Sequence, residues 1–252
     1  MKSQFSEFTY GYTLVEELSR GHRFSAVPIF PSLVEEGRVG GYDVSIELSG
    51  LPFFLQFKRS DCLVRSNAKY YSTFGSSYYR FDLHPLKHSQ QHNLLLQLER
   101  SGNPIFYVAP KFYKNTELHD KYFNSSIASG SIWIAPLQIG NLPDEEEHSI
   151  CFNSTATQVY FCSDPRLIEY SISNGVDEII KYLNAFKKRD EYLQSHRDTW
   201  ETLYNQLEDT LRTYDGAIYN KISRLIQREE DIVIKTARIA RLAFGADIMI
   251  YN

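Results

Sequence analysis

The strongest constraint on the fold is a pair of short segments in which apolar and polar residues alternate. The first spans residues 42–48 and the second spans residues 53–58, with four residues between them. Side chains on a strand point alternately to opposite faces, so a period of two predicts two β-strands. The short connection predicts that they pair as an antiparallel hairpin, with Leu48 opposite Phe53 and Asp43 opposite Lys58.

The two faces of this predicted hairpin differ in character. One face is polar except for Phe54, and it brings the carboxylate of Asp43, the amide of Gln56 and the ammonium group of Lys58 within reach of one another. The other face is entirely apolar and is expected to lie on the core: Val44, Ile46, Leu48, Phe53, Leu55 and Phe57.

These polar groups suit the hydrolysis of a phosphodiester, which needs a metal ion held by oxygen ligands. Asp43 supplies a charged oxygen, Gln56 a neutral one, and the main-chain carbonyl of Phe57 a third. Lys58 can stabilise the negative charge that develops on the phosphate. The alternative is an ordinary cross-strand pair between Asp43 and Lys58 on a half-exposed hairpin, an interaction that is common and weak.

A first helix is expected upstream and is begun by Ser6. It carries four apolar residues at helical spacing, which are Phe8, Tyr12, Val15 and Leu18.

The order of a helix with glutamates, Asp43, and then Gln56-Phe57-Lys58 resembles the PD-(D/E)xK, or restriction-endonuclease-like, nuclease superfamily. The Q-x-K form is similar to the variant of some restriction and prokaryotic defence nucleases. The resemblance covers residues 6 to about 110.

The resemblance implies a mixed sheet flanked by helices and cleavage of DNA that depends on Mg²⁺ or Mn²⁺. It also implies an effector of an anti-phage or restriction-type defence system. Glu17 is chosen as the metal ligand from the first helix, beside Asp43 and Gln56, while Glu7 and Glu16 stay open because the rotation of the helix is not determined. Gln56 replaces a carboxylate of the usual motif, so Glu47 is a further candidate ligand. The alternative function is a pseudo-nuclease that acts as a noncatalytic scaffold.

The chain divides by pattern into an α/β region, residues 1–170, and a helical region, residues 171–252. A strand at 53–58, a helix at 89–100 and a strand at 105–109 are compatible with a crossover, which would be right-handed if the two strands are parallel. The helical region is expected to pack as a hairpin or to dock on a partner. That partner would be a separate sensor or ATPase subunit, or a second copy of the chain, because no Walker A pattern is present here.

Basic and aromatic residues alternate just after the hairpin, which suits contacts with a nucleic acid backbone and its bases. The alternative is a solvated loop. Gln91 and His92 open the next predicted helix and are expected at the rim of the site, while zinc binding by His84, His88 and His92 is a weak alternative. The expected DNA-binding residues are Arg59, Arg65, Lys69 and Tyr79.

Composition narrows the function further. The net charge of −4 argues against passive coating of nucleic acid, although it permits a local basic patch. The three cysteines show no spacing of a metal site or disulfide framework, which favours the cytoplasm. The longest apolar run is too short to span a membrane.

Overall fold

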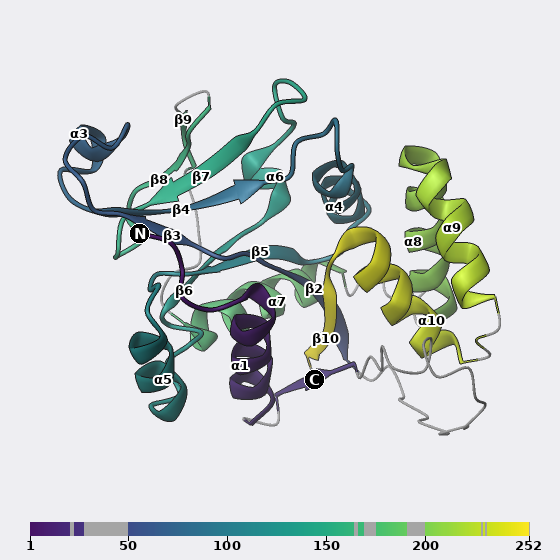
Figure 1. Cartoon of the computed structure of the whole chain (residues 1–252). Coiled ribbons are helices and arrows are strands. Elements are labelled where there is room, and N and C mark those ends of the chain that lie inside the picture. The colour runs from purple at the N-terminus through teal and green to yellow at the C-terminus, as the bar shows by residue number, and fades with distance from the viewer. Residues whose placement is uncertain are drawn as a thin grey trace.

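A computed structural model describes residues 1–20, 23–27, 50–163, 166–168, 175–190, 200–227, 229 and 231–251, and the structural statements below concern this part of the chain. Two five-stranded sheets pack against each other, with helices around them (Figure 1). The predicted α/β class is confirmed. The first sheet has the order β1 (Phe24–Ala26), β10 (Asp247–Tyr251), β2 (Leu51–Phe57), β5 (Ile105–Pro110) and β6 (Ser131–Ile134).

The second sheet is antiparallel throughout and has the order β3 (Asp61–Leu63), β4 (Tyr78–Leu83), β7 (His148–Phe152), β8 (Val159–Phe161) and β9 (Arg166–Leu167). The helices are α1 (Glu7–Arg20), α3 (Tyr71–Phe74), α4 (Gln91–Arg100), α5 (Asn115–Phe123), α6 (Pro136–Ile139), α7 (Val176–Asp190), α8 (Trp200–Tyr214), α9 (Gly216–Ile226), α10 (Ile232–Ile239) and the π-helical η2 (Ala240–Phe244).

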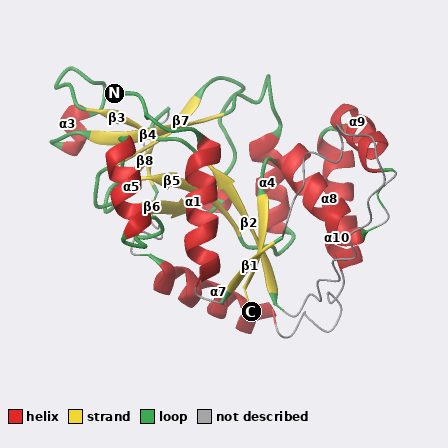
Figure 2. Ribbon diagram, turned by 60° about the horizontal axis from the view of Figure 1, so that its bottom comes forward, coloured by secondary structure: helices red, strands yellow, loops and turns green. Residues whose placement is uncertain are grey.

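The two faces of the first sheet bury different sets of side chains. Phe53, Leu55 and Phe57 of β2 pack in one apolar cluster with residues of α1, α5 and α7. Phe54 points the other way, into a larger cluster that also holds residues of α4, the second sheet and helices α8 to α10. Figure 2 shows α1, α5 and α7 on the same side of this sheet. The alternation predicted for residues 53–57 is therefore confirmed, but both faces are covered.

The pairing of β2 differs from the predicted hairpin. Phe54 and Leu55 pair on one edge with β10, antiparallel, and on the other edge with β5, parallel. The hairpin register is therefore wrong, because no edge of β2 is left for residues 42–48 at these two positions. That segment itself lies outside the described residues. The parallel crossover from β2 through α4 to β5 is confirmed.

The C-terminal region also differs from its prediction. Residues 247–251 form β10, a strand inside the first sheet, rather than the end of a helical region. Helices α8 to α10 bury their apolar sides in the same cluster as Phe54. The division predicted at residue 170 therefore does not separate two cores.

The cysteines differ from their prediction. Cys151 of β7 and Cys162, just after β8, form a disulfide, so the cysteines no longer favour the cytoplasm. Cys62 is a buried free thiol.

Helix α1 begins as predicted. Ser6 accepts a hydrogen bond from the N–H of Thr9 at 3.0 Å, as expected for a cap. The predicted apolar face of this helix is wrong in part, because Phe8 and Tyr12 are exposed and Tyr10 and Leu14 are buried instead.

Gly11 permits α1 to lie close to β2. A Cβ atom at this position would lie 2.7 Å from Cδ2 of the buried Phe57 ring. We expect Gly11→Ala to lower the free energy of unfolding by about 1 kcal/mol or more, because overpacking outweighs the gain in helix propensity. Denaturant unfolding of the purified protein measures this change.

Gly216, the first residue of α9, provides the matched control. A Cβ there meets no atom of the described residues within 4 Å, so Gly216→Ala should leave stability equal or slightly higher. Equal effects of the two substitutions would contradict the close packing of α1 on β2.

Candidate functional site

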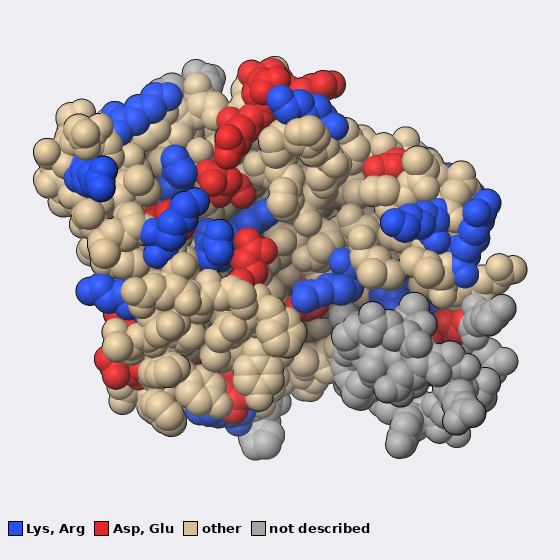
Figure 3. All heavy atoms as spheres, viewed as in Figure 1, with Lys and Arg blue, Asp and Glu red and all other residues tan. Residues whose placement is uncertain are grey.

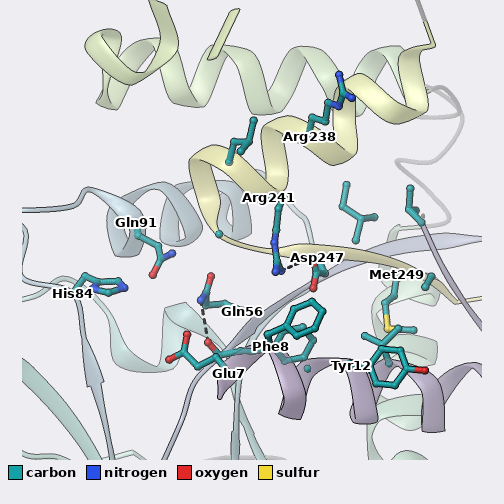
Figure 4. Close-up of a pocket in the computed structure, with 18 of the residues that line it drawn as sticks. Glu7, Phe8, Tyr12, Gln56, His84, Gln91, Arg238, Arg241, Asp247 and Met249 are labelled. Atoms are coloured by element: carbon teal, nitrogen blue, oxygen red, sulfur yellow. Dashed lines mark hydrogen bonds and ion pairs between the residues drawn. The ribbon is translucent and has the colours of Figure 1, made fainter. Parts of the chain in front are cut away.

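A cleft of about 980 Å³ opens beside the point where β10 begins, between α1 on one side and η2 with α10 on the other (Figure 4). Its walls are mainly apolar, and polar side chains gather at one end, as is usual for ligand sites. Within the described part of the chain, the charged and amide side chains that line it are Glu7, Gln56, His84, Gln91, Arg238, Arg241 and Asp247.

Gln56 lies near the end of β2 and is only 6% exposed. Its Nε2 donates a hydrogen bond to the carbonyl of Phe57 at 3.1 Å, whereas its buried Oε1 has no partner among the residues that the structure describes. A buried acceptor without a donor destabilises a fold by about 1–3 kcal/mol, so such an atom is typical of a position that meets a ligand. Gln56 belongs to the cleft, as predicted.

Gly245 accounts for the close approach of η2 to Gln56. Its φ of +63° is left-handed, which favours glycine, and it ends the π-helical segment. A Cβ at this position would lie 2.8 Å from Oε1 of Gln56 and would also collide with Nε2 of Gln91. Two side-chain amides therefore flank this glycine at the polar end of the cleft.

Lys58 follows β2 and is not among the residues that line the cleft. It is more deeply buried than the alternative of a cross-strand pair on a half-exposed hairpin implied. It is 3% exposed, and its backbone N–H continues the pairing by donating to the carbonyl of Val108 at 2.8 Å. The Nζ atom donates to Oε1 of Gln91 at 3.4 Å and lies 5.8 Å from the centre of the Tyr107 ring. Burial lowers the pKa of Lys58, and the charges of Glu7 and Asp82 offset this only in part.

Two carboxylates reach the same cleft from different elements. Glu7, in the first turn of α1, accepts a hydrogen bond from the backbone N–H of Arg59 at 3.3 Å. Asp247 pairs with Leu55 in the sheet and forms an ion pair with Arg241 at 2.7 Å. Burial raises the pKa of Asp247, and Arg241 opposes that shift. Figure 4 shows Gln56 between these two carboxylates.

The acidic residues predicted as metal ligands do not all lie at the cleft. Asp43 and Glu47 lie outside the described residues. The prediction of Glu17 as a ligand is wrong, because its carboxylate accepts hydrogen bonds from the backbone N–H groups of Ile127, at 2.6 Å, and Ala128, at 3.1 Å. Glu16, the other alternative, pairs with Arg20 at 2.5 Å.

The rotation of α1 explains which glutamate reaches the cleft. Glu7, Gly11 and Val15 line the cleft and follow one another at intervals of four residues, so they share one face of the helix. Glu17 lies on another face, toward the turn at residues 127–130. The sequence left this choice open because it does not determine the rotation of the helix.

The predicted DNA-binding residues lie outside the cleft. Arg59, Arg65 and Lys69 are exposed, and Lys69 lies over the ring of Tyr70 at 5.1 Å. Tyr79 is half-buried and stacked on Phe152, with 5.8 Å between ring centres, so its prediction as a stacking surface is corrected. Figure 3 shows basic side chains gathered on the surface over the β3, β4 and α3 region.

The three histidines of the zinc alternative do not form one site. His84 lines the cleft, where the charge of Lys58 and burial lower its pKa. His92 is buried, with its ring nitrogens 3.0 Å from the hydroxyl of Tyr107 and 2.7 Å from the carbonyl of Gly140. His88 and His92 thus form no zinc site with His84, and the described residues contain no group of three or more His, Cys, Asp or Glu side chains placed to hold a metal ion.

The sequence predicts Gln91 and His92 at the rim of the site. Gln91 lines the cleft, whereas His92 is buried and does not line it. Arg241 and Asp247 were missed, because their positions depend on β10 joining the first sheet beside β2. Their only signal in the sequence is a charged pair at the end of the last helical pattern, which occurs on many exposed helices.

Comparisons with protein family models, with curated proteins and with solved structures found no match. Within the described ranges, no helix combines the length and the apolar character that a membrane span requires.

Lys58→Met tests whether the buried ammonium is retained at the expense of stability. The folded state holds this lysine at a pKa below its ordinary value of 10.5, so it favours the neutral form. We expect the substitution to raise the free energy of unfolding at neutral pH by about 1 kcal/mol or more. Denaturant unfolding at several pH values measures it.

The sign of the pH dependence follows from the same shift. Between the lowered pKa and 10.5 the unfolded state binds more protons at Lys58, so the stability of the parent should rise with pH in that window. Lys58→Met should lose this contribution, while Lys221→Met, at an exposed lysine of α9, should change neither property. A marked destabilisation by Lys58→Met would show that Lys58 supports the fold instead.

Proposed function

We propose that this chain is a metal-dependent nuclease that hydrolyses DNA phosphodiesters in the cleft beside β2. The observation that carries the proposal is the buried pair formed by Gln56 and Lys58 at the end of one strand. Among the described residues, the side-chain oxygen of Gln56 has no partner, and the ammonium group of Lys58 donates to the amide of Gln91. Burial of these two groups does not favour the stability of the fold, and such groups are typical of a site that binds charge.

The side chains at the cleft suit Mg²⁺ or Mn²⁺ in donor type. Such ions prefer oxygen ligands, and Mg²⁺ is usually held by one or two carboxylates with water and substrate phosphate. The unpartnered Oε1 of Gln56 and a carboxylate from Asp43, Glu7 or Asp247 would hold the ion. When bound, it would activate water and polarise the phosphate.

The chain's own residues would supply the remaining steps. Lys58 would stabilise the charge that develops on the phosphate, and Gln91 holds its ammonium group in position through the 3.4 Å hydrogen bond. Glu7 and His84, on the same cleft, are candidates to accept or donate a proton. Arg241 offsets part of the negative charge at Asp247.

The setting proposed for this activity is the cytoplasm of a prokaryote, where the chain would be the effector of an anti-phage or restriction-type system. It rests on the resemblance of Asp43, Gln56 and Lys58 to the Q-x-K nucleases. A separate sensor or ATPase subunit, or a second copy of the chain, would then provide activation. Helices α8 to α10 bury one side in the chain's own core, so such a partner would meet their outer sides.

The activity is tested with purified protein, plasmid DNA and single-stranded circular DNA, with Mg²⁺ or Mn²⁺ and with a chelator. We expect cleavage that needs the metal and that falls about 100-fold or more in Lys58→Ala and Gln56→Ala, because each removes a group that acts on the transition state. The matched control Lys221→Ala should cut like the parent. Binding of DNA without cleavage under all metal conditions would favour the noncatalytic alternative.

Asp43→Asn and Asp247→Asn distinguish the two aspartates. We expect Asp43→Asn to lose about 100-fold or more of the cleavage rate and Asp247→Asn to lose much less, because Arg241 already occupies the Asp247 carboxylate. Cleavage rates on the same substrates measure both. The reverse order would move the metal ligand from residue 43 to β10.

A further inference from the structure

Two exposed aromatic side chains follow one face of α1 along the cleft. Phe8 is 73% exposed and Tyr12 is 61% exposed, and both line the cleft one helical turn apart. Their exposure is unfavourable for large aromatic groups and is not explained by packing of the core, which uses Tyr10, Leu14 and Leu18. Figure 4 shows Phe8 and Tyr12 on the α1 side of the cleft.

The opposite wall combines aliphatic and cationic groups. Leu225 and Leu242 are exposed there, and Arg238 and Arg241 lie beside them. Both arginines are ion-paired, Arg238 with Glu229 at 2.9 Å and Arg241 with Asp247 at 2.7 Å. Each ion pair occupies only some of the five N–H groups of a guanidinium, so donors for a phosphate remain.

The polar end of the cleft adds hydrogen-bonding groups that suit the edge of a base. Oε1 of Gln56 and Nε2 of Gln91 lie near the same point, 2.8 Å and 2.3 Å from where a Cβ at Gly245 would stand. With Oε1 of Gln56 given to the metal ion, Nε2 of Gln91 is the donor beside it for an acceptor on the edge of a nucleobase. The bases of a duplex are stacked and paired, so neither their faces nor their pairing edges would reach these groups.

We propose that the cleft binds unpaired nucleotides, with bases stacked between Phe8, Tyr12 and the aliphatic wall and with the backbone at the arginines. Stacking on aromatic groups beside cationic ones is the chemistry that holds single-stranded nucleic acid. This inference rests on the proposed function, since it names single-stranded DNA as the substrate of the same site.

The experiment measures binding without metal, so that cleavage does not intervene. A fluorescein-labelled single strand of about 15 nucleotides and the same strand annealed to its complement are titrated with the full chain in a chelator, by fluorescence anisotropy. We expect the single strand to bind about 10-fold or more tightly than the duplex. The Phe8→Ala/Tyr12→Ala double variant should lose about 10-fold or more in affinity for the single strand.

Phe123→Ala is the matched control, because Phe123 is 80% exposed on α5 and does not line the cleft. It should bind like the parent, and thermal unfolding should show that the double variant is folded, since its two side chains are exposed. Equal or tighter binding of the duplex, an unchanged double variant, or no binding of either oligonucleotide would overturn the inference.

The failure of one proposal can be distinguished from the failure of the other. Tighter binding of the single strand without cleavage in Mg²⁺ or Mn²⁺ would support this inference and contradict the nuclease. Metal-dependent cleavage of plasmid by a chain that does not prefer the single strand would support the nuclease and contradict this inference.

Discussion

The strand β2 is hydrogen-bonded along both edges and covered on both faces, and the site depends on that position. At Phe54 and Leu55 it pairs with β10 and with β5, so its path and the directions of its side chains are set from both sides. The pairing with β10 ends at Leu55, while the pairing with β5 continues to Phe57. Gln56 therefore lies where one neighbouring strand stops, and the cleft opens at that point.

This position explains how polar groups come to be buried there. A central strand has no solvated face, so Gln56 and Lys58, which alternate with the apolar residues Leu55 and Phe57, are buried. Gln56 meets Gly245, which leaves room for its amide but offers it no donor. Lys58 meets Gln91 and the Tyr107 ring, and burial lowers its pKa. Gln56 therefore places an acceptor in the cleft, and Lys58 is a buried cation hydrogen-bonded to Gln91 on the cleft wall.

The two walls of the cleft come from opposite ends of the chain. Helix α1 supplies Glu7, Phe8 and Tyr12, and the segment from α10 to β10 supplies Arg241 and Asp247. The close contact of Gly11 with Phe57 holds the first wall against the sheet, and the pairing of β10 with β2 holds the second. Figure 4 shows the polar groups of both walls around the end of β2. A ligand there would be held between elements that the core already makes rigid.

The sequence by itself determined the α/β class, the alternation along residues 53–57, the crossover through α4 and the membership of Gln56 and Gln91 in one site, since these follow from periodicity and from neighbours along the chain. Only the tertiary structure decided that β10 pairs with β2, that Glu7 rather than Glu17 reaches the cleft, and that Arg241 and Asp247 join it. Strand pairing between distant segments depends on long-range hydrogen bonding, and the rotation of α1 depends on which of its two apolar faces packs on the sheet. One face carries Phe8, Tyr12 and Val15, and the other carries Tyr10, Leu14 and Leu18. The second face packs on the sheet, because Gly11 beside it lets the helix approach more closely.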